Sequence, residues 1–230
     1  MKAVGIVGYQ GSGKTKLVVS LSKELSKRGY EVATLKHTRG EVDLPDKDTA
    51  KHKKYARSVG VISLGESAVF FKGKKSLEDI LSHLNADFYL LEGFKEEKTY
   101  PKIICLSGKD EDKRLFDGLE ISVISKESKG EIKRLANLVE ERAFKLPNLN
   151  CEKCGFKTCY GLARQIVKGK KTIENCVSLR PTTEVEIDGE LVSMNPFISS
   201  VIRNTIKGML SPLKGYREGK EIRVKIGEEK

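Results

Sequence analysis

Long apolar runs, tryptophan and export signals are missing from this sequence of 230 residues. Its longest stretches without a charged residue are 3–13 and 191–202, and both are shorter than the roughly 18 apolar residues that cross a bilayer. The segment after Met1 carries one Lys, is broken by glycines and has no small-residue cleavage site, so it predicts no signal peptide. These absences predict a cytoplasmic protein without a membrane span.

Charge is present in excess of one sign, with 43 Lys and Arg against 32 Asp and Glu and a net charge of +11. Such a balance suits a polyanionic partner, which is nucleic acid, an anionic membrane surface or a phosphorylated small molecule. Residues 151–230 carry 15 basic and 10 acidic side chains, a net of +5, but few aromatic residues accompany them. A base-stacking platform for nucleic acid is therefore not expected.

Cysteine is scarce except in one place. Cys105 lies alone in the first part of the chain, while four further cysteines fall within 26 residues, at positions 151, 154, 159 and 176. The stretch 145–150, Lys-Leu-Pro-Asn-Leu-Asn, comes directly before them and has the composition of a short linker. We therefore expect two domains, residues 1–146 and residues 147–230.

Strand-like and helix-like segments alternate in residues 1–146, which predicts an α/β domain. The strand-like segments are short, apolar and rich in β-branched or aromatic residues, which favours a mostly parallel sheet covered by helices on both faces. The expected strands are 3–7, 31–35, 61–64, 68–71, 88–91, 103–105 and 121–124, and the expected helices are 14–28, 49–58, 77–84 and 131–141.

A complete phosphate-loop pattern, G-x-x-x-x-G-K-[ST], lies between the first expected strand and the first expected helix. Its glycines let several backbone N–H groups point at phosphate oxygens, and the helix adds the positive end of its dipole. Lys14 is expected to reach the β- and γ-phosphates, and the Thr15 hydroxyl to bind Mg²⁺. The pattern predicts a P-loop NTPase fold, with the nucleotide bound by Gly8, Gln10, Gly11, Ser12, Gly13, Lys14 and Thr15.

Two carboxylates are candidates for the metal ligand or for ordering a catalytic water. Glu92 ends the apolar segment 88–91 and is followed by Gly93, which permits close backbone approach; the alternative is a solvated strand end. Asp43 lies in the loop after the second expected strand, where a surface role is nearly as well supported. We assign catalytic roles to Lys14, Glu92 and Asp43.

The segment 36–39, Lys-His-Thr-Arg, follows the second expected strand and is expected to face the bound phosphates. Asp48 fits that role and also fits a helix N-cap. His37 and His52 alone do not make a metal site.

These stretches together resemble the molybdopterin-guanine dinucleotide biosynthesis protein B family. The resemblance rests on residues 8–15, on 35–37 with Asp43 and 47–49, and on Leu-Leu-Glu-Gly-Phe-Lys at 90–95 followed by Pro-Lys-Ile at 101–103. It implies GTP binding with slow hydrolysis and a homodimer. It also implies an accessory role beside the guanylyltransferase that attaches GMP to molybdopterin, with molybdenum or tungsten enzymes as clients.

Two other nucleotide-binding patterns are absent. No Asn-Lys-x-Asp stretch of the kind that recognises guanine in many GTPases occurs, so the preference for GTP rests on the resemblance. The second Lys that partition and cluster-carrier ATPases place directly after the first glycine is also missing, because Tyr9 follows Gly8. This difference argues against an ATP-driven scaffold.

The spacing Cys151-x2-Cys154-x4-Cys159-x16-Cys176 supplies four thiolates, which suits a [4Fe-4S] cluster because each iron takes one soft sulfur ligand. Zinc is the rival, although structural zinc sites more often present two tight cysteine pairs. Disulfides are not expected without export. Residues 151–180 also resemble a small iron–sulfur domain of corrinoid proteins and electron-transport subunits. Cys105 lies in an apolar strand and is expected to be a core residue.

The remaining residues predict a small α+β module. Residues 184–192 alternate around Asp188-Gly189 as a hairpin does, a helical stripe covers 198–209, and a last strand is expected at 221–226.

The resulting hypothesis is a GTP-binding accessory protein of molybdenum or tungsten cofactor synthesis that carries a [4Fe-4S] cluster. Two alternatives stay open. One is a nucleotide-dependent carrier or maturation factor for another metallocofactor, and the other is a nucleotide-switched module that binds nucleic acid. The basic charge is better explained by two bound anionic cofactors than by nucleic acid, since a [4Fe-4S]²⁺ core with four thiolates contributes about −2 and a nucleotide is also anionic.

Overall fold

The computed structural model describes residues 1–38, 40, 42, 47–125, 131–179, 183–187, 190–192, 196–217, 221–224 and 227. The chain forms two compact units, Met1–Cys176 and Val177–Lys230, and each is considered by itself. Among the described residues, no helix has both the length and the hydropathy that a bilayer crossing requires.

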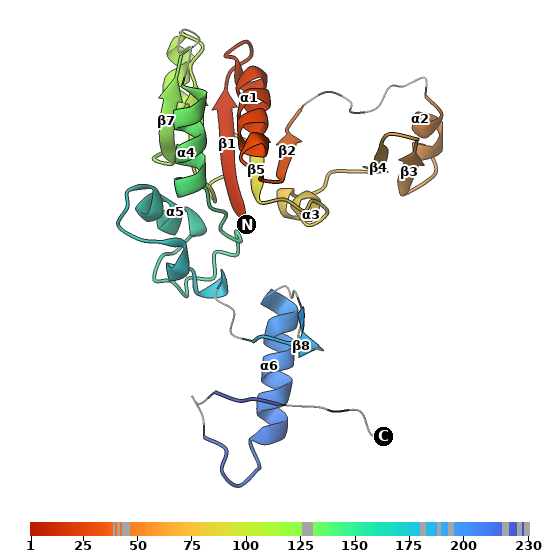
Figure 1. Cartoon of the computed structure of the whole chain (residues 1–230), viewed down its shortest axis with the longest axis vertical. Helices are drawn as coiled ribbons and strands as arrows, with labels where there is room; N and C mark the ends of the chain where they lie inside the picture. The colour runs from red at the N-terminus through yellow and green to blue at the C-terminus, as the bar shows by residue number, and fades with distance from the viewer. Residues whose placement is uncertain are drawn as a thin grey trace. The chain divides into compact units, whose positions relative to one another are not determined.

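A five-stranded sheet forms the centre of the first unit (Figure 1). All its neighbouring strands pair in parallel, and their order is β2-β5-β1-β6-β7. The predicted α/β class is confirmed. The strands are β1 (Lys2–Gly8), β2 (Val32–Lys36), β5 (Phe88–Glu92), β6 (Lys102–Cys105) and β7 (Glu120–Ile124).

Helices α1 (Lys14–Lys27) and α4 (Ile132–Arg142) pack on one face of this sheet. Apolar residues repeat at helical spacing in α1, and this stripe is buried. Gly29, with φ +90, follows the end of the helix in the left-handed conformation that glycine adopts readily. The core between helices and sheet includes Val4, Ile6, Leu17, Leu21, Leu25, Phe88, Leu90, Ile103, Leu135 and Val139.

The opposite face is covered by α3 (Leu77–Leu81) and by the chain between β5 and β6. Ser76 caps α3, because its hydroxyl accepts from the N–H of Asp79 and the Asp79 carboxylate accepts from the N–H of Ser76. Tyr100 is fully buried on this face. A Cβ at Gly5 would lie 2.8 Å from the Tyr100 ring, so the glycine permits this close packing.

Two expected strands do not join the parallel sheet. Strands β3 (Ser58–Ile62) and β4 (Ser67–Phe71) form a separate antiparallel hairpin. The helix expected at 49–58 is also shorter, since α2 spans Asp48–Lys53 and Ser58 already lies in β3. The basic residues Lys51, His52 and Lys53 occupy the last turn of α2, where the helix dipole favours positive charge.

The chain does not divide at the expected position near residue 146. Leu146 is fully buried, and its N–H donates to the carbonyl of Thr99 at 2.8 Å. Leu119, Phe144 and Leu146 form one apolar cluster with α5 (Cys159–Val167) and Cys176. The cysteine segment therefore belongs to the first compact unit because it shares a core with the residues that precede it.

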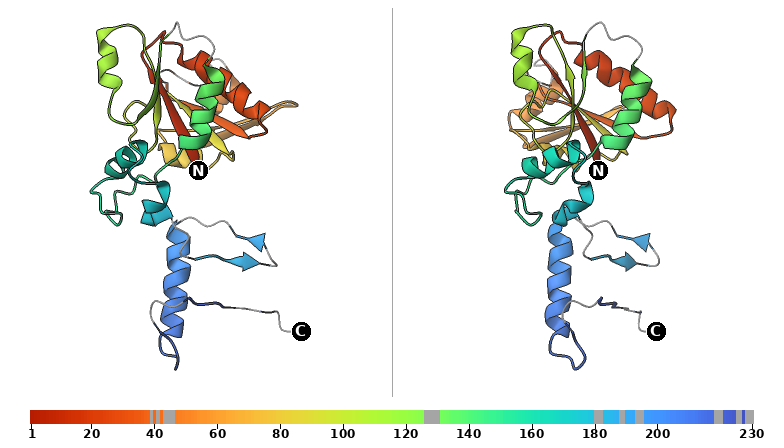
Figure 2. Two further views of the ribbon diagram at one scale, coloured as in Figure 1. Left: turned by 60° about the vertical axis from the view of Figure 1, so that its left-hand side comes forward. Right: turned by 90° about the vertical axis from the view of Figure 1, so that its left-hand side faces the viewer.

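The second unit contains the helix that was expected there, α6 (Pro196–Leu210), and a short pair of strands, β8 (Glu186–Ile187) and β9 (Glu190–Leu191) (Figure 2). The Asp188-Gly189 turn lies outside the described residues. The last expected strand is wrong for its described part, because residues 221–224 adopt no regular structure. A strand needs a neighbour for its backbone groups, and no pairing is recorded for this described stretch.

The buried stripe of α1 yields a stability prediction. Leu21→Ala should lower the free energy of unfolding by about 2–5 kcal/mol, because it leaves a cavity in the core beneath the sheet. Val19→Ala is the matched control on the same helix, since Val19 is 62% exposed and Leu21 is 0% exposed. Chemical denaturation followed by circular dichroism measures both, and an equal loss in the two variants would contradict this packing.

Candidate functional site

The predicted phosphate loop occupies residues 8–15, between the end of β1 and the start of α1. Gly11 and Gly13 have φ values of +75 and +90, a left-handed conformation that favours glycine. Gly8 has no room for a side chain, because a Cβ there would lie 2.3 Å from Ser12 Oγ and 2.5 Å from the carbonyl oxygen of Cys105. The pattern of glycines is therefore required by the backbone of the loop.

Three features of the loop suit a phosphate group. The N-cap of α1 is Gly13, which offers no side-chain cap, and the first turn of the helix holds no acidic residue. Its first N–H groups are thus open to an external anion. Ser12 Oγ is buried and has no hydrogen-bond partner among the described residues. Such an atom lacks the bond that a phosphate oxygen would provide, so the residues fit the predicted ligand.

Lys14, Thr15 and Glu92 come together at the carboxyl end of the sheet. Lys14 Nζ donates to the carbonyl of Tyr9 at 2.7 Å, and Thr15 Oγ1 donates to Glu92 Oε1 at 2.9 Å. Parallel pairing explains the second contact, because the register places Ile6 of β1 opposite Glu92 of β5. A hydroxyl beside a carboxylate is a donor set that Mg²⁺ accepts.

Glu92 is not a solvated strand end, since only 7% of its surface is exposed. Lys36, at the end of β2, has its Nζ 3.4 Å from the same Oε1 atom, and the prediction that residues 36–39 face the phosphates stays a prediction. Gln10 belongs to the loop and is exposed. Asp43 and Arg39 lie outside the described residues, so the role predicted for Asp43 stays a prediction.

The chain after Glu92 adds residues that the sequence pattern did not identify as functional. Gly93 has φ +99 and lies against His37, and the next residue, Phe94, has its ring centroid 5.3 Å from that of His37. Lys95 Nζ lies 3.6 Å from the centroid of the Tyr9 ring, inside the phosphate loop. The Glu-Gly-Phe-Lys stretch is part of the family resemblance. Its contact with Tyr9 depends on the fold, so no pattern in the sequence predicts this contact.

A buried ion pair follows on β6. Lys102 is 1% exposed, and its Nζ donates to the carbonyl of Lys95 and to Asp117 Oδ2, each at 2.7 Å. Lys98 Nζ donates to the same carboxylate oxygen at 2.6 Å. Burial alone would raise the pKa of Asp117, but the bonds from Lys102 and Lys98 outweigh it and hold this pKa below its ordinary value.

The four predicted cluster ligands occupy different environments. Cys159 and Cys176 are buried in the same apolar cluster, Cys154 packs against it, and Cys151 is exposed. The residue before Cys151 and the residue after it, Asn150 and Glu152, have positive φ values of 45 and 58. Backbone of this kind is uncommon outside glycine and is found at ligand-holding turns.

The donor set fits an iron–sulfur cluster in chemistry, since three of the sulfurs lie in or against one apolar cluster that excludes water. The N–H of Cys159 donates to Asn150 Oδ1 at 2.8 Å, which holds the turn against the start of α5. Thr158 caps this helix through the N–H of Gly161. Within the described part of the chain, no three His, Cys, Asp or Glu side chains gather closely enough for a single ion.

Cys105 is a core residue, as predicted. It is fully buried at the end of β6, and burial raises the pKa of its thiol to about 12. The thiol therefore stays protonated and packs beneath the phosphate loop.

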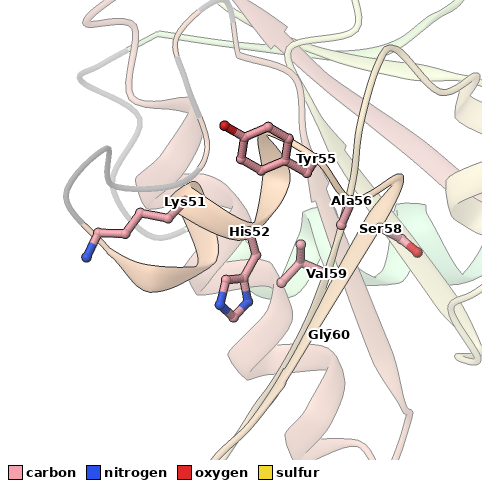
Figure 3. A pocket seen from close by; sticks show the side chains of 7 residues that line it. All are labelled: Lys51, His52, Tyr55, Ala56, Ser58, Val59 and Gly60. Carbon is pink, nitrogen blue, oxygen red and sulfur yellow. The ribbon is translucent and has the colours of Figure 1, made fainter.

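A pocket of about 520 Å³ lies beside α2 and β3 (Figure 3). Its lining residues are Lys51, His52, Tyr55, Ala56, Ser58, Val59 and Gly60. None of these is a predicted site residue. His52 is the one His, Cys, Asp or Glu among these seven lining residues, so the lining does not form a metal site.

Two family models match the chain. The model described as molybdopterin guanine dinucleotide synthesis protein B matches residues 3–126, and a model described as "Putative Fe-S cluster" matches residues 146–178. These matches bear out both resemblances drawn from the sequence.

Known proteins match either a part of this chain or nearly all of it. A "Putative molybdopterin-guanine dinucleotide biosynthesis adapter protein" of Methanocaldococcus jannaschii is 33% identical over 98% of this chain and 97% of its own length. An adapter protein of Haemophilus influenzae with the same pathway in its name is 35% identical over 44% of this chain and 61% of its own length. The crystal structure of MobB from Bacillus subtilis superposes with a TM-score of 0.51 at 23% identity, over 63% of this chain and 99% of that one.

The buried ion pair yields a prediction with a defined pH dependence. Asp117→Asn should lower the free energy of unfolding by about 3–5 kcal/mol, because it leaves the buried Lys102 without its countercharge. The native pKa of Asp117 is lowered, so the contribution is present above the ordinary pKa of about 4 and is lost as the pH falls through the native value. The difference between wild type and variant should therefore shrink in acid.

Denaturation curves at neutral and acidic pH test this dependence. Asp110→Asn is the control, since Asp110 is exposed and its pairing with Lys113 is a surface contact. A difference between wild type and Asp117→Asn that stays constant down to strongly acidic pH would contradict the assignment.

Proposed function

The chain belongs to the molybdopterin guanine dinucleotide synthesis protein B family, and from this premise we propose that it is a GTP-binding adapter in molybdenum cofactor synthesis. GTP and Mg²⁺ bind at residues 8–15, and hydrolysis is slow. The partners are molybdopterin, its guanylyltransferase and the molybdenum or tungsten enzymes that receive the finished cofactor. The chain works as a homodimer in the cytoplasm.

The observation that carries this proposal is the contact between Thr15 Oγ1 and Glu92 Oε1 at the end of a complete phosphate loop. Both oxygens suit Mg²⁺, which keeps several waters and takes few protein ligands. Lys14 leaves the carbonyl of Tyr9 and turns to the terminal phosphates, where its charge stabilises the anion. Glu92 holds the metal or orients its water, and Lys36 limits the charge that Glu92 carries into the site.

The second part of the proposal is a [4Fe-4S] cluster held by Cys151, Cys154, Cys159 and Cys176. The second family match and the apolar cluster around three of these residues support it. Such a group supplies one-electron transfer, and the protein sets its potential through hydrogen bonds and exposure. Because cytosolic thiols are kept reduced, cysteines that serve as iron ligands agree with a cytoplasmic location.

The surroundings of the cysteines offset the charge of such a cluster. Several exposed basic residues lie near the four cysteines in sequence, and they have no ion pair among the described contacts. They are Lys153, Lys157, Lys168, Lys170 and Lys171. An anionic cluster accounts for this local excess without nucleic acid.

Nucleotide binding is tested by removing the charge that meets the terminal phosphates. Lys14→Ala should weaken binding of Mg²⁺ with GTP at least 100-fold in isothermal titration calorimetry, since no other group replaces this contact. Lys16→Ala is the matched control, because Lys16 is an exposed residue two positions along the same helix. Equal affinity in wild type and Lys14→Ala would contradict the proposed nucleotide site.

The cluster is tested by counting metal and sulfide. Anaerobically purified protein should be brown and contain about four irons and four sulfides per chain. Cys176→Ala should lose most of this iron because one corner of the cluster then lacks its thiolate. Cys105→Ala should keep the iron, since Cys105 lies in the core beneath the phosphate loop. A colourless protein loaded with zinc would contradict the cluster.

A further inference from the structure

One segment of the chain, residues 93–102, connects β5 to the first residue of β6, and it contacts the phosphate loop and the neighbours of a predicted cluster ligand. At its first end, Glu92 precedes it and Lys95 Nζ lies 3.6 Å from the Tyr9 ring of the phosphate loop. At its second end, Lys102 Nζ reaches back to the carbonyl of Lys95 at 2.7 Å. The side chain of Lys102 is buried, so this bond fixes the shape of the segment.

The second end continues to the cysteine helix. Lys102 and Lys98 both donate to Asp117 Oδ2, and the backbone carbonyl of Asp117 accepts a hydrogen bond from the Tyr160 hydroxyl. Tyr160 directly follows Cys159, a predicted cluster ligand, in α5. Lys98 Nζ also lies 5.5 Å from the centroid of the Tyr160 ring. The contacts through Asp117 are hydrogen bonds, and the side chains of Lys102 and Asp117 are shielded from water.

The first end of the segment lies beside groups that a bound nucleotide would also use. Lys14 Nζ donates to the Tyr9 carbonyl, and Thr15 Oγ1 donates to Glu92. A phosphate and Mg²⁺ would compete for the same Lys14 ammonium and Thr15 hydroxyl, so their binding would replace both bonds. Tyr9 contacts Lys95 of the segment and Glu92 directly precedes it, and both would lose a partner in that exchange.

We propose that residues 93–102 and Asp117 form a link through which nucleotide binding at the phosphate loop changes the packing of α5 around Cys159. The link rests on the proposed function, because it needs a nucleotide at residues 8–15. It gives the chain a way to adjust the surroundings of the cluster according to nucleotide state. The coupling is reciprocal. If nucleotide changes the affinity of the chain for the cluster by some factor, then the cluster changes the affinity for nucleotide by the same factor.

Hydrogen exchange on the full-length, cluster-loaded protein tests the link. Addition of Mg²⁺ with a non-hydrolysable GTP analogue should change the amide exchange rate in α5 by about five-fold or more, the lower end of ordinary coupling between sites. Tyr160→Phe removes only the hydroxyl that bonds Asp117 and keeps the ring, so the response in α5 should fall below two-fold while nucleotide still binds.

Arg142→Met is the matched control. Arg142 Nη2 donates to the carbonyl of Val167 at 2.7 Å, so this variant also removes one hydrogen bond to α5, but from α4. Its nucleotide response should remain. Lys95→Met tests the first end of the link and should reduce the response as Tyr160→Phe does, because it removes the cation over the Tyr9 ring.

The outcomes separate the link from the proposed function. If wild type binds nucleotide and α5 exchange does not change, or if Tyr160→Phe responds as wild type does, the link is wrong and nucleotide binding stands. If Arg142→Met loses the response as well, the route through Asp117 is wrong. If wild type binds no nucleotide, both the proposed function and the link are wrong.

Discussion

Parallel pairing of β1 with β5 is the constraint on which the rest of the first unit depends. It buries Val4, Ile6, Phe88 and Leu90 together beneath α1 and α4, and it brings the carboxyl ends of both strands to one edge. The phosphate loop leaves β1 at that edge and Glu92 ends β5 there. A carboxylate 77 positions away from Thr15 therefore meets its hydroxyl at 2.9 Å. The core and the candidate nucleotide site are consequences of the same register.

The crossover from β5 to β6 explains why the cysteine segment belongs with the first unit. The chain that leaves Glu92 must cross β1 to reach β6, and on the way it supplies Lys95 beside Tyr9 and Thr99 beside Leu146. Asp117 then binds the two lysines of this segment and the Tyr160 hydroxyl. A buried charge of this kind stabilises little on its own, but its removal leaves a partner unpaired. The pair thus specifies how the cysteine helix and the sheet fit together.

Much of this arrangement could be predicted from local sequence. The phosphate loop, the strand that ends at Glu92 and the four cysteines each have residue types whose chemistry is tied to short spacing, and the strands of the central sheet are continuous apolar runs. The hairpin of β3 and β4 was harder, because short apolar strands do not reveal whether they join a sheet or pair with each other. The contacts of Lys95, Lys102 and Asp117 join residues from separate loops, and no periodic pattern marks such contacts. The compact units divide after Cys176 and not near Leu146, because Leu146 is buried in the apolar cluster that contains the cysteine segment, and the Pro and Asn beside it give no sign of this burial.

The two anionic groups that we propose for this chain would account for its basic charge. Lys14 and Lys36 lie at the carboxyl end of the sheet, beside the phosphate loop. The lysines next to Cys151 and Cys154 in sequence lie near the predicted cluster ligands. We propose that one chain carries a nucleotide and an iron–sulfur cluster at once. Stoichiometry on a single anaerobic preparation tests it most directly: the account predicts one bound GTP, with Mg²⁺, and about four irons per chain. Binding of only one of the two groups, or of neither, would contradict it.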